Sequence, residues 1–147
     1  MRRVWAGVFL AVCAGCGTDG YRLAPVSGRV AVDGKPVAGL TVTFEPVGSR
    51  ERPNPGPGAV GVTDRAGRFQ LSTVPGGRRG AVVGPCRVRI RVVVHEGGDA
   101  DPWLDPALPR SRQSVRHLPL RYNDKTELTF EVPPGGTEGA NFELSWK

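Results

Sequence analysis

The chain has 147 residues, a formal net charge of +6, 21 Gly, 14 Pro and only three Cys. That length suits one domain with a modest core. The basic residues alternate with apolar ones and are not interleaved with aromatic side chains, which argues against a nucleic-acid partner. The charge instead favours solubility or attraction to an acidic surface.

The first segment, MRRVWAGVFLAVCAGCG, has the three parts of an export signal. Two arginines are followed by an apolar run over residues 4–12 and by the small pair Ala14-Gly15. The apolar run is too short to span a bilayer, which takes about 20 residues. The stretch before Cys16 resembles a bacterial lipobox, and this resemblance implies that Cys16 is lipidated after cleavage of the signal before it.

An alternative stays open, because an ordinary signal peptide can also carry cysteines. In addition, Cys13 stands where a lipobox usually has Leu. Cys16 is the better candidate for cleavage, since a small residue precedes it, whereas the β-branched Val12 precedes Cys13.

We therefore predict a signal peptide over residues 1–15, a lipidated tether over 16–24 and one domain over 25–147. Residues 16–147 carry 18 Lys and Arg, after removal of Arg2 and Arg3, against 14 Asp and Glu. The protein is expected in the cell envelope, where the N-terminal lipid holds it to a membrane, facing the periplasm or the cell surface.

Apolar and polar residues alternate with a period of two along the rest of the chain, which predicts an all-β domain. Seven strands are expected, over residues 26–33, 40–46, 60–64, 69–73, 87–94, 128–132 and 141–144. Asp33-Gly34 suits a two-residue hairpin turn, and Asp64 can cap a turn in which Gly67 adopts a positive φ. One core should contain Phe44, Phe69, Ile90, Leu128 and Phe142.

Cys86 begins the strongest alternating stretch, CRVRIRVVV. The alternation predicts that Cys86 faces the core and that Arg87, Arg89 and Arg91 face solvent. Most such cysteines are buried small hydrophobes. A catalytic thiol would need a nearby base, and the chain has only two histidines, at positions 95 and 117.

Three stretches interrupt the strand pattern, at residues 50–58, 73–84 and 95–117. Loops as long as the last one are usually functional or disordered. This loop carries an acidic cluster from Asp99 to Asp105. Pro102 breaks the cluster and no EF-hand spacing completes it, so a solvated loop is favoured over a cation site and no metal is expected.

Three stretches together resemble the carboxypeptidase regulatory-like, transthyretin-like domains of small bacterial lipoproteins: VSGRVAVDGKPVAGLTVTFEPV, GVTDRAGRFQL and LPLRYNDKTELTFEVPPGGTEGANFEL. The resemblance covers most of residues 25–145 and implies a seven-stranded, transthyretin-like (Ig-like) antiparallel β-sandwich. It also implies that Gly39 permits close backbone passage. Tyr122 would pack its ring on the edge of the core and bond its hydroxyl to the backbone.

The architecture is similar to that of hydroxyisourate hydrolases, but those enzymes use several histidines and end in Tyr-Arg-Gly-Ser, whereas this chain ends FELSWK. We therefore expect no catalytic residues and no cofactor, and a structural or protein-interaction role. The alternative is a carbohydrate- or peptide-binding module that uses the 95–117 loop, with Trp103 and Tyr122 as candidate ligand contacts. The expected partners are the membrane and an envelope protein or glycan.

Overall fold

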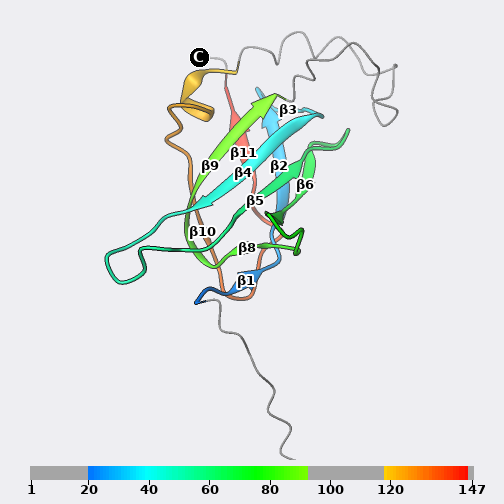
Figure 1. Ribbon diagram of the computed structural model, residues 1–147. Helices are drawn as coiled ribbons and strands as arrows, with labels where there is room; N and C mark the ends of the chain where they lie inside the picture. Colours follow the sequence, from blue (N-terminus) through cyan, green and yellow to red (C-terminus); the bar gives the residue numbers. More distant parts are fainter. Residues whose placement is uncertain (1–19, 93–117, 146–147) are drawn as a thin grey trace, which may run out of the picture.

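The computed structural model describes residues 20–92 and 118–145 (Figure 1). In this part of the chain the secondary structure consists of eleven strands and one short 3-10 helix, η1 (Leu120–Tyr122). The strands form two main sheets in a sandwich-like arrangement and a separate two-stranded pair. The all-β prediction is confirmed.

The first sheet is antiparallel throughout, in the order β10-β9-β4-β5-β7. Its strands are β4 (Leu40–Pro46), β5 (Gly58–Val62), β7 (Ser72–Val74), β9 (Gly84–Val92) and β10 (Thr129–Val132). The long strands β4 and β9 pair along their length, from Leu40 opposite Val92 to Pro46 opposite Cys86. This pair forms the middle of the domain.

The second sheet is built around β2 (Ser27–Val32). β3 (Lys35–Pro36) and β6 (Arg68–Gln70) pair with β2 in antiparallel fashion. β11 (Phe142–Leu144) pairs with β2 in parallel. The prediction of a wholly antiparallel sandwich is therefore wrong at the β2–β11 pair.

The two sheets share one hydrophobic core. The ring of Phe44 on β4 is fully buried and its centroid lies 6.1 Å from that of Phe142 on β11. Phe130 on β10 is also 6.1 Å from Phe142. The predicted shared core is confirmed, because Phe44, Phe69, Ile90 and Phe142 are buried in one cluster and Leu128 packs, partly buried, against it.

The strand predicted over residues 69–73 is divided at Leu71. β6 before this residue pairs with β2 of the second sheet, whereas β7 after it pairs with β5 of the first. The chain therefore crosses between the sheets at Leu71. Phe69, Leu71 and Thr73 are all buried, so the alternation continues across the break and gives no sign of it.

One strand pair formed where the sequence predicted none. β1 (Leu23–Ala24) pairs with β8 (Ala81–Val82). Leu23 and Ala24 fall within the tether predicted over residues 16–24, so the folded part begins before residue 25. Two-residue strands carry no alternation that a sequence pattern could reveal.

The two predicted turns are confirmed. Asp33 and Gly34 have φ values of 48° and 77° and join β2 to β3 as a two-residue hairpin. The Oδ1 atom of Asp64 accepts hydrogen bonds from the N–H groups of Ala66 (2.8 Å) and Arg68 (2.9 Å).

The role expected for Gly39 is wrong. A Cβ atom at this position would meet nothing within 4 Å, so no backbone passes close to Gly39. Its φ of 74° is the feature that favours glycine there.

Candidate functional site

The predicted site residues are only partly covered by the structure. Cys16, Trp103 and the 95–117 loop, including its acidic cluster and both histidines, lie outside the described residues. Tyr122 is described, at the end of η1, and 9% of it is exposed. Because Trp103 lies outside the described residues, the role of Trp103 and Tyr122 as ligand contacts stays a prediction.

Tyr122 lies at the edge of the core, as predicted. Its Oη atom accepts a hydrogen bond from the N–H of Ser145 (3.0 Å) and donates one to the carbonyl oxygen of Ser145 (3.2 Å). The guanidinium of Arg121 stacks over the ring, 4.8 Å from its centroid. The hydroxyl and one ring face are thus used within the protein.

Cys86 is a buried thiol, which confirms the expectation from the strand pattern. Only 1% of it is exposed, and its Sγ lies 3.8 Å from the carbonyl oxygen of Val82. Burial, with a smaller contribution from the charge of Glu131, raises the pKa of the thiol to about 11. Cys86 is therefore protonated at neutral pH and is a poor nucleophile.

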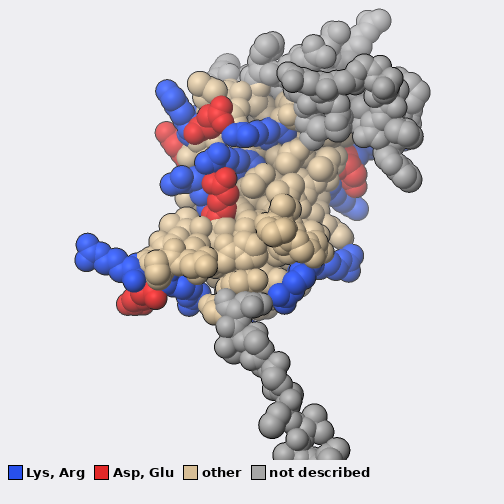
Figure 2. Space-filling view, viewed as in Figure 1, with Lys and Arg blue, Asp and Glu red and all other residues tan. Residues whose placement is uncertain are grey.

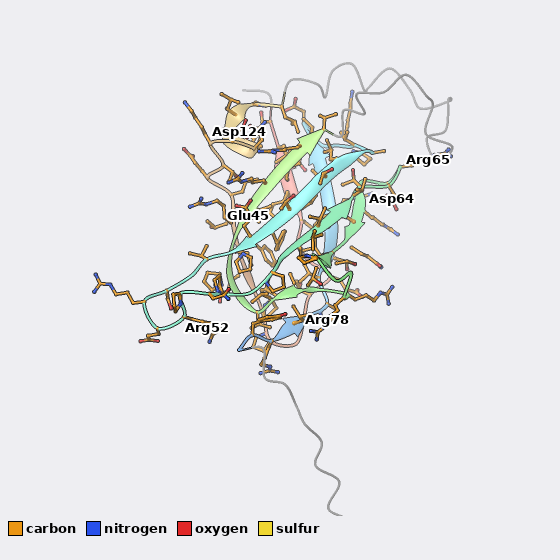
Figure 3. All side chains as sticks on the ribbon, in the orientation of Figure 1. Glu45, Arg52, Asp64, Arg65, Arg78 and Asp124 are labelled. Carbon is orange, nitrogen blue, oxygen red and sulfur yellow. The ribbon has the colours of Figure 1, made fainter. Side chains whose placement is uncertain are left out.

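The arginine row of β9 faces outward, as predicted, on the face of the first sheet shown in Figure 2. Blue and red side chains lie side by side over this strand. Glu45 lies near the middle of the sheet and Asp124 at the end that carries η1 (Figure 3). Acidic groups are thus close to the arginines.

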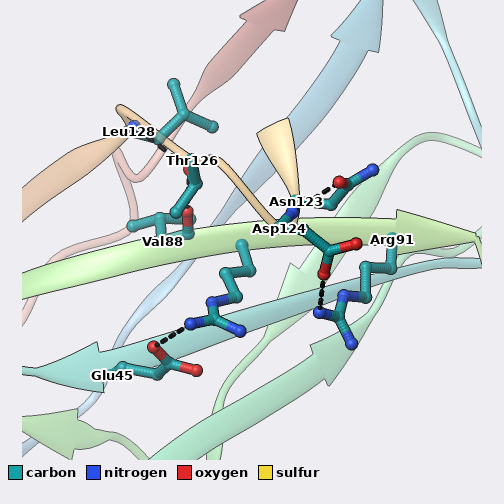
Figure 4. Close-up of polar contacts among 8 residues, drawn as sticks. Glu45, Val88, Arg91, Asn123, Asp124, Thr126 and Leu128 are labelled. Atoms are coloured by element: carbon teal, nitrogen blue, oxygen red, sulfur yellow. Dashed lines mark hydrogen bonds and ion pairs between the residues drawn. The ribbon is translucent and has the colours of Figure 1, made fainter. Parts of the chain in front are cut away.

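Two ion pairs neutralise most of this row (Figure 4). Arg89 pairs with Glu45 at 3.3 Å, and Arg91 pairs with Asp124. The Oγ1 atom of Thr126 accepts a hydrogen bond from the N–H of Leu128 and donates one to a carbonyl oxygen of β9, which fixes the segment that carries Asp124. Two of the three arginines of the row are therefore paired with acids of the same chain, which disfavours the row as a site for an anionic polymer.

A polar groove opens on the second sheet, with a volume of about 870 Å³. Ser27 and Arg29 of β2, Arg68 and Gln70 of β6, and Glu138 and Asn141 from the C-terminal segment line it. A second hollow of about 520 Å³ shares Ser27, Gln70 and Glu138 with the groove. The two hollows are therefore neighbours that share part of their lining.

Some groove side chains are fixed by bonds within the protein. The Nε atom of Arg29 donates to the carbonyl oxygen of Ala66 (2.9 Å), and Arg79 donates to Oε1 of Gln70 (3.4 Å). Glu138 and Asn141 are exposed. Among the lining residues the one aromatic side chain, Phe69, is buried, so the groove presents no ring, and Val62 is its exposed large apolar side chain.

The sequence interpretation missed this groove because its walls come from distant parts of the chain. The parallel pairing of β11 with β2 brings the C-terminal segment next to Ser27 and Arg29. One local signal existed, the glycine within β2. A Cβ at Gly28 would lie 1.9 Å from the carbonyl oxygen of Ala140, so only glycine allows this contact.

In residues 20–92 and 118–145, no three His, Cys, Asp or Glu side chains are grouped so that they could hold a metal ion. Over the same residues, none of the helices has the length and apolar character needed to cross a membrane. Comparison with known proteins gives no match to any family model, curated protein or solved structure.

Proposed function

We propose that this protein is a lipid-anchored, non-catalytic interaction module of the cell envelope, built on a carboxypeptidase regulatory-like, transthyretin-like domain. The export signal and the cysteine at position 16 support the anchor. The Asp33-Gly34 hairpin and the Asp64 turn lie in the stretches that carry the resemblance, and the position of Tyr122 is one that it implies, so these features support the proposed domain family.

The polar groove is the observation that carries the interaction role. It offers two guanidinium groups, two carboxylates and two side-chain amides, from Arg29, Arg68, Asp64, Glu138, Gln70 and Asn141. Hydrogen-bond donors and acceptors gathered in one groove suit a polypeptide with polar side chains. Sugar rings usually stack on an exposed aromatic ring, and the groove presents none. A protein partner is therefore favoured at this site.

The state of the thiol supports a non-catalytic role. Cys86 is protonated and buried, so it does not act as a nucleophile. Two of the three outward arginines of β9, Arg89 and Arg91, are paired with Glu45 and Asp124, which disfavours a preorganised anion site. Binding, and not bond cleavage, is the activity that these residues suit.

Site-specific cross-linking in the native envelope tests this proposal. A photoreactive amino acid replaces Gln70 or Asn141, which line the groove, and Arg87, which is exposed on the other sheet, serves as the control position. We expect one partner protein to be captured from positions 70 and 141 and not from 87, and its capture to fall in an Arg68→Glu background. Equal capture from all three positions, or none from the groove, would contradict the proposal.

A glycan array separates the carbohydrate alternative from the protein-binding role. Sugar binding that disappears in Trp103→Ala would favour the 95–117 loop as the site. Sugar binding that persists in this variant would show that Trp103 is not the ligand contact.

A further inference from the structure

Five exposed arginines gather at the end of the domain where the described chain begins. We define this basic end as residues 20–24, 47–57, 75–83 and 133–136. Its arginines are Arg22, Arg50, Arg52, Arg78 and Arg79, all of them exposed. Its one acid is Glu51.

These four segments converge in space although they are far apart in the chain. β1 pairs with β8, and the N–H of Val83 donates to the carbonyl oxygen of Arg22 (2.9 Å). A Cβ at Gly56 would lie 2.8 Å from the ring of Tyr21, so the 47–57 loop passes beside β1. A Cβ at Gly136 would lie 2.4 Å from the carbonyl oxygen of Pro25, the residue that follows β1. Figure 3 places Arg52 and Arg78 at the β1 end and Asp124 at the other end.

The basic end holds the whole net charge of the mature chain. Residues 16–147 contain 18 basic and 14 acidic residues. The basic end has five of the basic residues and one of the acidic residues. The 13 basic and 13 acidic residues elsewhere cancel in charge. Asp19 in the tether would reduce the local excess from four to three. Blue side chains lie on both sides of β1 in Figure 2, whereas over β9 blue and red alternate.

The arginines of the loop tip are available to a partner. Among the described residues, Arg50 and Arg52 take part in no ion pair. Two backbone hydrogen bonds, one in each direction between Ser49 and Arg52, close a tight turn in which both arginines are exposed. Arginine suits phosphate because its planar fork can donate two parallel hydrogen bonds.

We propose that the basic end binds the anionic phosphate headgroups of the membrane to which Cys16 anchors the chain. The inference rests on the proposed lipid anchor. Only three residues separate Cys16 from Gly20. A fully extended chain of this length spans about 14 Å. The anchor thus holds the start of the basic end, at Gly20 and Arg22, close to the range of about 8–10 Å over which charges act in physiological salt.

Spin labelling of the mature, lipidated protein tests this surface. One label replaces Ser49 at the basic end and another replaces Lys125 at the opposite end, while the buried, protonated Cys86 stays unlabelled. The protein is placed in vesicles of phosphatidylcholine alone or with phosphatidylglycerol. We expect the label at position 49 to be shielded from a water-soluble relaxation agent only in the anionic vesicles, and high salt to remove the shielding. The label at position 125 stays accessible in both.

Charge-matched variants identify the groups responsible. Each arginine near an anionic surface contributes about fivefold to binding, so Arg50→Gln with Arg52→Gln should weaken docking about 25-fold. Lys35→Gln with Arg87→Gln removes the same charge from exposed positions outside the basic end and should leave the shielding unchanged. Equal shielding in neutral vesicles, or equal effects of the two double variants, would overturn the proposal.

Mass spectrometry of the same sample separates this inference from the anchor. A lipidated Cys16 without shielding at position 49 would refute headgroup binding by the basic end and would support the lipid anchor. If Cys16 carries no lipid, cosedimentation of the unlipidated protein decides. Salt-sensitive binding to anionic vesicles that falls in the Arg50 and Arg52 variant supports the surface, and no such binding refutes it.

Discussion

The hydroxyl of Tyr122 exchanges hydrogen bonds with both backbone groups of Ser145, accepting from the N–H at 3.0 Å and donating to the carbonyl at 3.2 Å. Ser145 follows β11 directly, so these bonds tie η1 to the end of the C-terminal strand. Tyr122→Phe keeps the ring but leaves the N–H of Ser145 without this acceptor. We expect the free energy of unfolding to fall by about 1–3 kcal/mol, measured by urea denaturation.

Tyr21→Phe is the matched control for this variant. In the described part of the chain the Tyr21 hydroxyl forms no hydrogen bond, so its removal should change stability by less than about 0.5 kcal/mol. An equal loss in both variants would show that the Ser145 bonds contribute nothing.

The loss of unfolding free energy when a core residue is truncated to Ala should increase with the burial of that residue. Phe44 is fully buried and contacts the rings of Phe130 and Phe142, so Phe44→Ala should cost about 3–5 kcal/mol in unfolding free energy. Leu128 is only partly buried, so Leu128→Ala should cost less. Guanidinium denaturation of both variants checks the order, and a larger cost at Leu128 would contradict the packing described.

Gly28 should not tolerate a methyl group. A Cβ there would lie 1.9 Å from the carbonyl oxygen of Ala140, and backbone cannot yield as a flexible side chain does. Gly28→Ala should therefore cost about 1–3 kcal/mol or more. At Gly135 a Cβ would meet nothing within 4 Å, so Gly135→Ala should be neutral or stabilise by about 0.4–1 kcal/mol. Thermal denaturation compares the two, and equal melting temperatures would contradict the contact.

The thiol of Cys86 predicts a loss of stability at high pH. Its pKa rises from 9.0 in the unfolded chain to about 11 in the fold. Above pH 9 the unfolded chain ionises while the folded protein stays protonated, so the unfolded state binds fewer protons and stability falls as pH rises. The slope is about 1.4 kcal/mol per pH unit until pH 11.

Urea titrations at several pH values measure this slope against Cys86→Ala, which lacks the group. Other titrating residues are common to both proteins, so the difference belongs to the thiol. The same pH dependence of the unfolding free energy in both proteins, or rapid labelling of the native thiol at neutral pH, would contradict the burial of Cys86.

Cys16→Ala should block cleavage and lipidation of the precursor, because it removes the thiol that receives the lipid. Cys13→Ala keeps Cys16 and should be processed normally. Intact-mass measurement of the mature N-terminus checks both variants. A mature protein that begins at an unmodified residue other than Cys16 would refute the anchor.

Sequence reasoning succeeded where the alternation was long and local. The strand predicted over residues 40–46 is β4 with the same bounds, and the arginine row of β9 faces outward as expected. Both turns formed because Asp33-Gly34 and Asp64 act through their own backbone and side-chain bonds. Such features need no knowledge of distant residues.

The features that were missed depend on pairing between distant segments. The crossing at Leu71 leaves every apolar residue buried, so the pattern continues while the partner strand changes. The parallel β2–β11 pair, and with it the groove, follows from the path of the whole chain. Patterns within a dozen residues carry no information about either.

The β2–β11 pair joins segments that are far apart in the chain. Val30 pairs with Phe142, 112 positions further along the chain, so the second sheet cannot close until the last strand is present. Long-range closure of this kind is slow. If the chain is exported as we propose, its precursor would lack a closed second sheet until β11 has been synthesised.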